Sequence, residues 1–147
     1  MDGLVRAVDE GFYVAPQIAP EDVAAIKAAG VRTIVNNRPD GEAPGQPTGA
    51  EIEAAATAAG LAYVAVPVVP GGLFPDHVAA MREAVEANEG PFLAYCRSGT
   101  RSCHLWALVA AQKQAPNAVI EKAAAAGYDV AAMRPLLMRI NAARPGD

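Results

Sequence analysis

The segment with the clearest chemistry runs from Cys96 to Arg101 and has the sequence Cys-Arg-Ser-Gly-Thr-Arg. It follows the apolar run Pro91–Tyr95, which predicts a buried strand, and it leads into Arg101–Lys113, which predicts an apolar helix. A cysteine between a strand end and a helix N-terminus lies where the helix dipole stabilises a thiolate. Because the thiolate is the attacking form of the side chain, we predict that Cys96 is a catalytic nucleophile.

The other residues of this loop have the properties of an anion-binding site. Gly99 allows the chain to curl so that consecutive backbone amides point inward. The guanidinium of Arg101 could fold over the loop and hold two oxygens of an anion, which makes it the second predicted catalytic residue. Arg97 could attract anions, while Ser98 and Thr100 would set the loop geometry and bring hydroxyls near the sulfur. We therefore predict that Arg97, Ser98, Gly99 and Thr100 bind the substrate anion.

Two residues outside this segment are further candidates for the same site. Ser102 offers a second hydroxyl close to the sulfur. Arg38 ends a predicted core strand at the edge of the sheet where ligands bind. It could bind a substrate carboxylate or sulfonate, or it could hold its own loop by pairing with Asp40 or Glu42. We predict that Ser102 and Arg38 belong to the anion-binding residues.

A structural interpretation competes with this one, because free cysteines in proteins are usually buried and inert. Cys96 would then be a core residue beside a glycine turn. Cys103 could accept sulfur or form a disulfide, but its apolar neighbours favour a packing role. His77 and His104 are predicted to be helix surface residues. Two cysteines and two histidines at these spacings form no metal-ligand pattern, and no motif implies a metal or an organic cofactor.

The elements that position these residues alternate between strands and helices. This order predicts an α/β fold with a mainly parallel central sheet flanked by helices, in which ligands bind at the carboxyl ends of the strands. Three loops would meet there, namely Asn36–Thr48, Pro67–Phe74 and Cys96–Arg101. The predicted strands are Val5–Ala7, Phe12–Ala15, Val31–Val35, Leu61–Val66 and Pro91–Tyr95. The predicted helices are Pro20–Ala29, Ala50–Ala59, Asp76–Ala87, Arg101–Lys113, Pro116–Ala126 and Val130–Ala142, the last one kinked or split by Pro135.

The composition of the chain argues against several classes of protein function. The chain has 147 residues, 52% of them hydrophobic, which favours one globular domain over residues 1–147. Its net charge of −4 and the lack of a basic stripe argue against nucleic-acid binding. No apolar stretch approaches the roughly 20 residues of a membrane helix, and the acidic first ten residues do not resemble a signal peptide. We therefore expect a cytoplasmic protein with reduced thiols and no membrane partner.

Three segments together resemble one protein family. They are Phe12–Gln17, Gly30–Glu42 and Cys96–Ser102. In this order they are similar to the phosphatase-like domains of beta-lactamase hydrolase-like proteins, also called phosphatase-fold sulfurtransferases. The resemblance extends to about Ala111 and implies a three-layer architecture like that of the cysteine phosphatases. In those phosphatases the hydroxyl after the arginine donates to the thiolate, a role that the resemblance gives to Ser102. Family members fused to sulfide-oxidising enzymes imply work on sulfane sulfur, with such an enzyme as a partner.

Departures from the phosphatase pattern favour sulfur transfer over phosphate hydrolysis. Cysteine phosphatases have five residues between the cysteine and the arginine, whereas this loop has the four of a rhodanese-type loop. Tyr95 stands where phosphatases usually have histidine. The loop Pro67–Phe74 has no general-acid carboxylate, and the nearest acid, Asp76, is interpreted as a helix cap. A persulfide or sulfite leaving group is weakly basic and needs no general acid.

We therefore predict a sulfurtransferase that works through a Cys96 persulfide. It would move sulfane sulfur from thiosulfate, or from a small persulfide such as glutathione persulfide, to a thiol. The alternative is a dual-specificity-type phosphatase that works through a Cys96 phosphocysteine. A third possibility is a non-catalytic module that binds an anion or a persulfide and delivers it to a partner enzyme.

Overall fold

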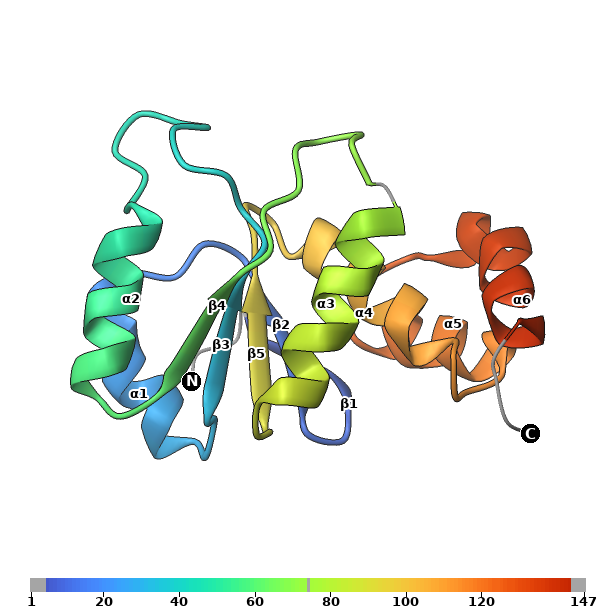
Figure 1. The fold of residues 1–147 in the computed structure, drawn as a ribbon, viewed down its shortest axis with the longest axis horizontal. Helices are drawn as coiled ribbons and strands as arrows, with labels where there is room; N and C mark the ends of the chain where they lie inside the picture. The colour runs from blue at the N-terminus through green and yellow to red at the C-terminus, as the bar shows by residue number, and fades with distance from the viewer. Residues whose placement is uncertain (1–4, 74, 144–147) are drawn as a thin grey trace.

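The computed structural model describes residues 5–73 and 75–143, and within these residues five strands form one sheet. The strand order across the sheet is β1–β2–β5–β3–β4 (Figure 1). The pairs β2–β5, β5–β3 and β3–β4 are parallel, and only the β1–β2 hairpin is antiparallel. The predicted mainly parallel α/β fold is therefore confirmed. The strands are β1 (Arg6–Asp9), β2 (Phe12–Ala15), β3 (Thr33–Asn36), β4 (Ala62–Ala65) and β5 (Phe92–Tyr95).

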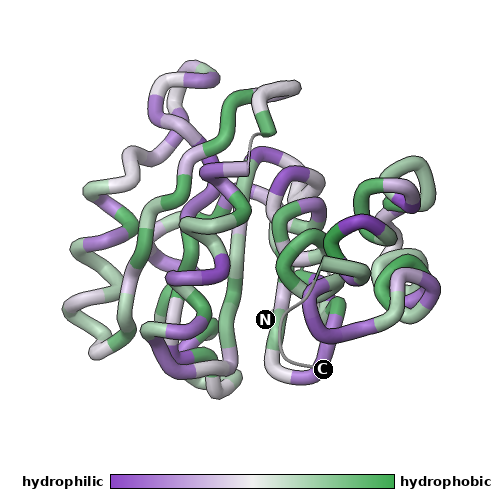
Figure 2. The backbone as a smooth tube through the Cα atoms, turned by 45° about the vertical axis from the view of Figure 1, so that its right-hand side comes forward, coloured by the Kyte–Doolittle hydropathy of each residue, from purple (hydrophilic) through white to green (hydrophobic). Residues whose placement is uncertain are grey.

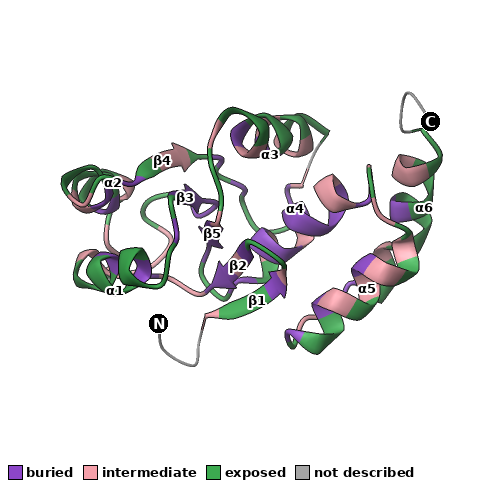
Figure 3. Cartoon of the chain, turned by 90° about the horizontal axis from the view of Figure 1, so that it is seen from below, coloured by how far each residue is buried: buried purple, intermediate pink, exposed green. Residues whose placement is uncertain are grey.

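Helices cover both faces of this sheet and produce the three layers that the resemblance implied (Figure 3). The helices α1 and α2 cover one face, α3 and α4 the other, and α5 and α6 pack on the outer side of α4. The helices are α1 (Val23–Ala28), α2 (Gly49–Ala58), α3 (Pro75–Ala87), α4 (Thr100–Ala110), α5 (Pro116–Ala125) and α6 (Arg134–Ala142), with 3₁₀ turns at Pro20–Asp22 and Ala131–Met133. Within the described residues, no helix combines the length and the apolar character needed to cross a bilayer.

The central strand β5 is buried along its whole length, because both of its faces are covered. All four of its residues are buried, as are all four of β3 beside it. Side chains of β5 alternate between the two cores: Leu93 and Tyr95 pack with α1 and α2, whereas Phe92 and Ala94 pack with α3 and α4. Hydrophobic positions accordingly run along the strands in the middle of the domain (Figure 2). The loop after β5 therefore starts from a rigid position.

The predicted elements are all present, and the differences lie at their ends. The first strand runs to Asp9, so the turn before β2 is shorter than expected. The long helix after the loop begins at Thr100 and ends at Ala110, before the predicted Lys113. Pro135 splits the last helix: the stretch 131–133 is a 3₁₀ turn, and Pro135 lies in the first turn of α6, where its missing N–H costs nothing. Residues 144–147, predicted to be a frayed tail, and the first four residues of the acidic N-terminal segment lie outside the described residues.

Candidate active site

The loop Cys96–Gly99 joins the end of β5 to the start of α4 at the carboxyl edge of the parallel strands. It is fixed to the end of β2, because the Cys96 amide donates to the Ala15 carbonyl at 3.3 Å and the Gln17 amide donates to the Arg97 carbonyl at 3.3 Å. The sequence prediction placed the loop at this edge, and the structure agrees. The predicted loop residues 96–102 are therefore together at one place in the fold.

Cys96 lies at the base of this loop, and its side chain is buried. The Gly99 amide donates a hydrogen bond to the Cys96 sulfur, with N and Sγ 3.1 Å apart. This hydrogen bond fixes the position of the sulfur at the base of the loop. Within the described residues, the amides of Arg97 and Ser98 have no hydrogen-bond partner, so they remain able to bind an anion. The loop therefore has one amide on the sulfur and two more amides without an internal partner.

Ser98 and Thr100 stabilise the shape of the loop. The Ser98 hydroxyl donates to Oγ1 of Thr100 at 3.0 Å and accepts the Thr100 amide at 3.4 Å. Both side chains are exposed at the start of α4, as is Arg97. These contacts agree with the predicted geometric role of the two hydroxyls. None of them reaches the Cys96 sulfur.

Arg101 is held in place by a carboxylate that the sequence analysis had not assigned to it. Its two Nη atoms donate to the two carboxylate oxygens of Glu42, each at 2.8 Å, and Nη1 also donates to the Val68 carbonyl at 2.6 Å. A guanidinium has five N–H groups, so two of them stay available for a substrate. The hydrogen bonds that Arg101 donates to Glu42, together with the nearby Cys96, raise the pKa of Arg101 and keep it charged.

Arg38 belongs to the same group of charges, in the second of its two predicted roles. Its Nε donates to Glu42 at 2.9 Å, and its Nη1 donates to Gln17 at 3.0 Å. Since Arg38 is buried, it fixes Glu42 and the loop rather than extending into an open pocket. We call these three residues, Arg38, Glu42 and Arg101, the arginine–glutamate triad. One negative and two positive charges leave the triad with an excess positive charge close to Cys96, which suits an anionic substrate or a thiolate.

Ser102 does not have the role that the resemblance assigned to it. Its side chain is fully buried, and its hydroxyl donates to Oδ1 of Asn37 at 2.7 Å instead of to Cys96. The Asn37 amide in turn donates to the Val66 carbonyl at 3.0 Å. Ser102 therefore connects the first turn of α4 to the end of β3. Ser102 as an anion-binding residue therefore stays a prediction, and in this structure its hydroxyl is hydrogen-bonded to Asn37.

A cavity of about 540 Å³ lies over the loop. Its polar wall comes from the loop and the start of α4, and its apolar wall comes from the segment that follows β4. No carboxylate belongs to its described lining, and Asp76 lies exposed elsewhere. The lining consists of Val68, Val69, Pro70, Gly71, Leu73, Arg97, Ser98, Thr100, Arg101 and His104. The cavity thus offers an apolar surface beside a positively charged one.

His104 is part of this cavity, although it was predicted to be a helix surface residue. It lies one helical turn after Thr100 on α4 and is half-buried. Burial lowers the pKa of its imidazole, so the neutral form predominates at neutral pH. A neutral imidazole is a hydrogen-bonding group and a weak base rather than a proton donor. The helical spacing from position 100 to position 104 could have revealed its position.

Cys103 lies fully buried in the core beside α4. Burial, and secondarily the nearby Cys96, raise the pKa of the Cys103 thiol to about 12. A thiol with such a pKa is not a thiolate at neutral pH, so the structure agrees with the packing interpretation. Within the described residues, no group of three or more histidine, cysteine, aspartate or glutamate side chains could hold a metal ion.

Tyr128, which follows α5, contacts the loop from the side of the C-terminal helices. Its hydroxyl donates to the Ser98 carbonyl at 3.2 Å, and the ring lies against Gly99. Gly99 has a φ of 93°, and a Cβ at this position would overlap the Tyr128 hydroxyl. Sequence reasoning did not find Tyr128, because thirty residues separate it from the loop and no local pattern marks it. Gly99 is thus required both for the backbone angle and for this contact.

Replacing Gly99 with alanine should lower the free energy of unfolding by at least about 2 kcal/mol, from the left-handed backbone and the overlap together. Removing the Tyr128 hydroxyl in a Gly99→Ala/Tyr128→Phe double variant should recover part of this loss, since only the backbone strain would remain. Urea unfolding of the two single variants and the double variant measures the coupling. Strict additivity of the two changes would show that the side-chain overlap is not the cause.

Comparison with known proteins relates this site to a family. Residues 4–115 match the model described as beta-lactamase hydrolase-like protein, phosphatase-like domain. A beta-lactamase hydrolase-like protein of Xylella fastidiosa is 38% identical over 101 residues, which are 69% of this chain and 23% of that protein. The chain therefore spans about a quarter of the length of the curated relatives it matches.

Solved structures agree with this assignment. A protein of Neisseria meningitidis described as a candidate phosphatase is 33% identical, with a TM-score of 0.82 over 95% of this chain and 99% of that one. The structure of PTPMT1, at 14% identity, has a TM-score of 0.67 over 94% of this chain and 96% of that one, and shows a shared fold. The chain belongs to the family of phosphatase-like domains found in beta-lactamase hydrolase-like proteins.

Proposed function

We propose that this chain is a cysteine-dependent phosphatase that acts on phosphate esters with weakly basic leaving groups through a Cys96 phosphocysteine. The observation that carries the proposal is the arrangement of Cys96 with the Gly99 amide on its sulfur and the charged Arg101 beside it. The membership in a phosphatase-like family and the similarity to the Neisseria protein support this reaction over the sulfur transfer favoured by loop length alone.

The reaction would proceed in two steps. The Cys96 thiolate attacks phosphorus, so that an S–P bond forms while the bond from phosphorus to the leaving oxygen breaks and the leaving group takes the electron pair. In this proposal the amides of Arg97 and Ser98, with the two uncommitted N–H groups of Arg101, bind the equatorial oxygens in the transition state. Water then cleaves the S–P bond and releases inorganic phosphate and the thiolate.

The leaving group decides which esters can react. General-acid catalysis is typically worth about 10²–10⁴-fold, and the cavity over the loop has no carboxylate in its described lining to provide it. His104 is neutral because burial lowers its pKa, so it is a poor proton donor at pH 7. Phenolate or phosphate leaving groups need little proton transfer. Aryl phosphates and phosphoanhydrides are therefore the substrate class that this site suits.

Sulfur transfer is the second candidate, and a specific feature favours it. The loop has four residues between Cys96 and Arg101, one amide fewer than a phosphatase loop of five, and it lacks an acid. In this reaction the thiolate would attack the outer sulfur of thiosulfate, an S–S bond would form, and sulfite would leave with the electron pair of the broken S–S bond. An acceptor thiolate such as glutathione would then take the sulfur from Cys96. Glutathione persulfide as donor and a sulfide-oxidising enzyme as partner belong to this second proposal.

One set of assays distinguishes the two reactions. The protein is incubated with 4-nitrophenyl phosphate, phenyl phosphate and glycerol 2-phosphate, and separately with thiosulfate and glutathione. We expect phosphate release from the nitrophenyl ester to exceed that from the alkyl ester by about 100-fold or more, because no acid assists the alkoxide. Intact-protein mass spectrometry after acid quench should show one added phosphoryl group on Cys96.

Three results of these assays would contradict the proposed phosphatase reaction. Equal rates on aryl and alkyl esters would contradict the absence of a general acid. A gain of one sulfur atom on Cys96 with thiosulfate, without phosphoryl transfer from any ester, would replace the first candidate by the second. Tight anion binding without turnover of either substrate class would indicate a binding module.

A further inference from the structure

The cavity over the Cys96 loop contains a cation whose charge the proposed reaction does not use. The side chain of Arg97 lines this cavity and is exposed, and within the described residues it forms no salt bridge. Arg101, by contrast, is only 14% exposed and is paired with Glu42. The backbone amide of Arg97 has a proposed role at phosphorus, whereas its guanidinium is left without a partner.

The charges in the cavity are positive throughout its described lining. Arg97 and Arg101 belong to this lining, and no carboxylate does. The third titratable side chain there, His104, is neutral at pH 7 because burial lowers its pKa. Arg101 lies close to Cys96, where the transferred phosphate must sit. A ligand with its phosphate at Cys96 would therefore still meet one unpaired cation, which favours a second anionic group.

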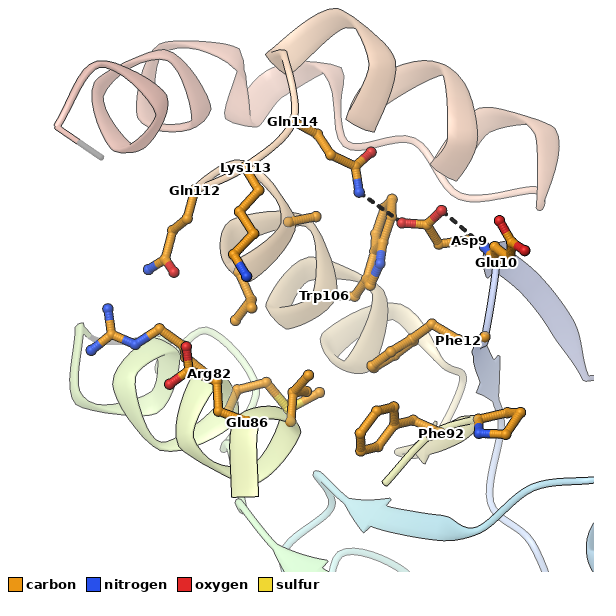
Figure 4. A pocket seen from close by; sticks show the side chains of 17 residues that line it. Asp9, Glu10, Phe12, Arg82, Glu86, Phe92, Trp106, Gln112, Lys113 and Gln114 are labelled. Carbon is orange, nitrogen blue, oxygen red and sulfur yellow. Dashed lines mark hydrogen bonds between the residues drawn. The ribbon is translucent and has the colours of Figure 1, made fainter. Parts of the chain in front are cut away.

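A cavity of about 640 Å³ at the opposite edge of the sheet has a different balance of charges (Figure 4). Glu10 and Glu86 line it together with Arg82 and Lys113, so its acids offset these two cations. The whole chain has a net charge of −4. The excess of positive charge over the Cys96 loop is therefore a local property of that cavity.

The apolar wall of the cavity over the Cys96 loop has side chains that a ligand can reach. Val69 is 55% exposed, Pro70 is exposed, and Leu73 is half-buried. The wall is fixed to the catalytic arginine, because Nη1 of Arg101 donates to the Val68 carbonyl at 2.6 Å. An accessible apolar surface next to the phosphate position favours a leaving group with an apolar face, such as an aromatic ring.

We propose that the cavity selects aryl phosphates whose ring carries a second anionic group, with the ring against Val69 and Leu73 and the second anion on Arg97. This inference rests on the proposed phosphatase reaction and narrows its substrate class. Arg97 is then a specificity-determining residue, because its guanidinium recognises the leaving group and takes no part in the chemical step.

Two phosphonates test this inference separately from turnover. They are 4-(phosphonomethyl)benzoate and its neutral carboxamide, whose P–C bond cannot be hydrolysed in place of the ester bond. Calorimetric titration of the full chain should give a dissociation constant of about 0.1–1 mM for the benzoate. The carboxamide should bind about 2–5-fold more weakly, as expected for one exposed ion pair. Shifts of the Ser98 and Thr100 amide cross-peaks in a ¹H–¹⁵N spectrum should place both ligands at the loop.

Charge variants identify the partner of the second anion. Arg97→Gln should abolish the preference for the benzoate, so that the two phosphonates bind alike. Arg97→Lys should keep most of the preference, because an exposed ion pair depends mainly on the charge. Arg139→Gln is the matched control: it removes an exposed positive charge on α6 and should leave the preference at its wild-type value.

Val69→Ser tests the apolar wall independently of the charge. It should weaken both phosphonates by the same factor, about 2–5-fold, because apolar surface that the ring would cover is lost. The preference for the benzoate should stay unchanged. Met138→Ser alters an equally exposed side chain on α6 and should change neither affinity.

Several outcomes would overturn the inference. They are equal affinity of the wild type for the two phosphonates, a preference that persists in Arg97→Gln, and no binding of either ligand up to about 10 mM, ten times the weakest affinity expected. An equal loss of affinity for both ligands in Arg97→Gln would show that Arg97 binds the phosphoryl group instead.

The same measurements keep this inference distinct from the proposed reaction. Turnover of 4-nitrophenyl phosphate without any preference for the benzoate would overturn this inference alone. Preferential binding of the benzoate without turnover of any ester would support the second anion-binding position and contradict the phosphatase reaction.

Discussion

Replacing Cys96 with serine is expected to reduce turnover at least about a thousandfold while leaving the fold intact. A serine oxygen can accept the Gly99 amide as the sulfur does, so the loop hydrogen bond is kept. A hydroxyl, however, has no accessible ionised form at neutral pH. Steady-state rates on 4-nitrophenyl phosphate, together with thermal unfolding of both proteins, measure the two effects separately.

Cys103→Ala is the matched control for this experiment. Cys103 is also buried and belongs to the same helix region, but its pKa of about 12 keeps it out of the chemistry. We expect this variant to lose stability, because a buried side chain is truncated, and to retain the activity per folded molecule. If turnover survived in Cys96→Ser but disappeared in Cys103→Ala, the nucleophile would be Cys103 and not Cys96.

The second large effect is expected at Glu42. Its carboxylate is the shared partner of Arg38 and Arg101, and the three side chains are between 5% and 14% exposed. In Glu42→Gln the two guanidinium groups would face one another without a negative charge between them. Removing one partner of a largely buried ion pair typically costs about 3–5 kcal/mol, and partial exposure reduces this to roughly 2–3 kcal/mol here.

Activity should fall as well, because the amide of glutamine has a single acceptor oxygen and no charge, so Arg101 would lose at least one of the two hydrogen bonds that orient it. We expect kcat to decrease about 10–100-fold, with a smaller change in KM. Glu51→Gln, an exposed glutamate on α2, is the matched control and should change neither quantity. An unaltered kcat in Glu42→Gln would show that Arg101 does not need this carboxylate.

The pH dependence of stability gives an independent test of the triad. The hydrogen bond from Arg101, reinforced by Arg38, lowers the pKa of Glu42 below its ordinary value near 4.5. A carboxyl whose pKa is depressed by folding stabilises the protein above the unfolded-state pKa, and this contribution is lost as the pH falls through the folded-state pKa. Urea unfolding below pH 4.5 should therefore show a shallower decline in Glu42→Gln than in the wild type.

Asp9 is the other carboxyl whose pKa is lowered, and the variant Asp9→Asn separates its contribution to the pH dependence from that of Glu42. The Asp9 pKa is lowered too, by hydrogen bonds from Lys122 and Gln114 that outweigh its burial. Each variant should remove its own part of the acid-induced loss of stability, and the two parts should add, since the groups lie at opposite edges of the sheet. Identical pH curves for the wild type and Glu42→Gln would contradict the depressed Glu42 pKa.

The local parts of the site could be predicted from the sequence. Cys96, Gly99 and Arg101 lie within six residues, and the apolar runs on both sides predict a strand and a helix there. The alternation of apolar strands with glycine-terminated helices also predicts a parallel sheet, because each helix brings the chain back to the edge where the previous strand began. These are properties of short segments, which a single sequence records directly.

The contacts that complete the site are long-range and could not be predicted in this way. Glu42 and Arg101 are 59 residues apart, and nothing in either segment identifies the other as its partner. Arg38 was predicted with two possible roles, and only the position of Glu42 decided between them. The partner of the Ser102 hydroxyl is also distant in the sequence, because it is the buried Asn37 just after β3 that accepts this hydrogen bond.

The contact between Tyr128 and the loop has a consequence for where this domain can be cut. The family match ends at residue 115, yet the apolar side of α4 is covered by residues after that point, among them Val119, Ala123 and Leu137. A fragment that stops at the end of the match would leave this hydrophobic surface in water and would remove the tyrosine that holds Gly99. We therefore expect the smallest stably folded piece to include α5 and α6.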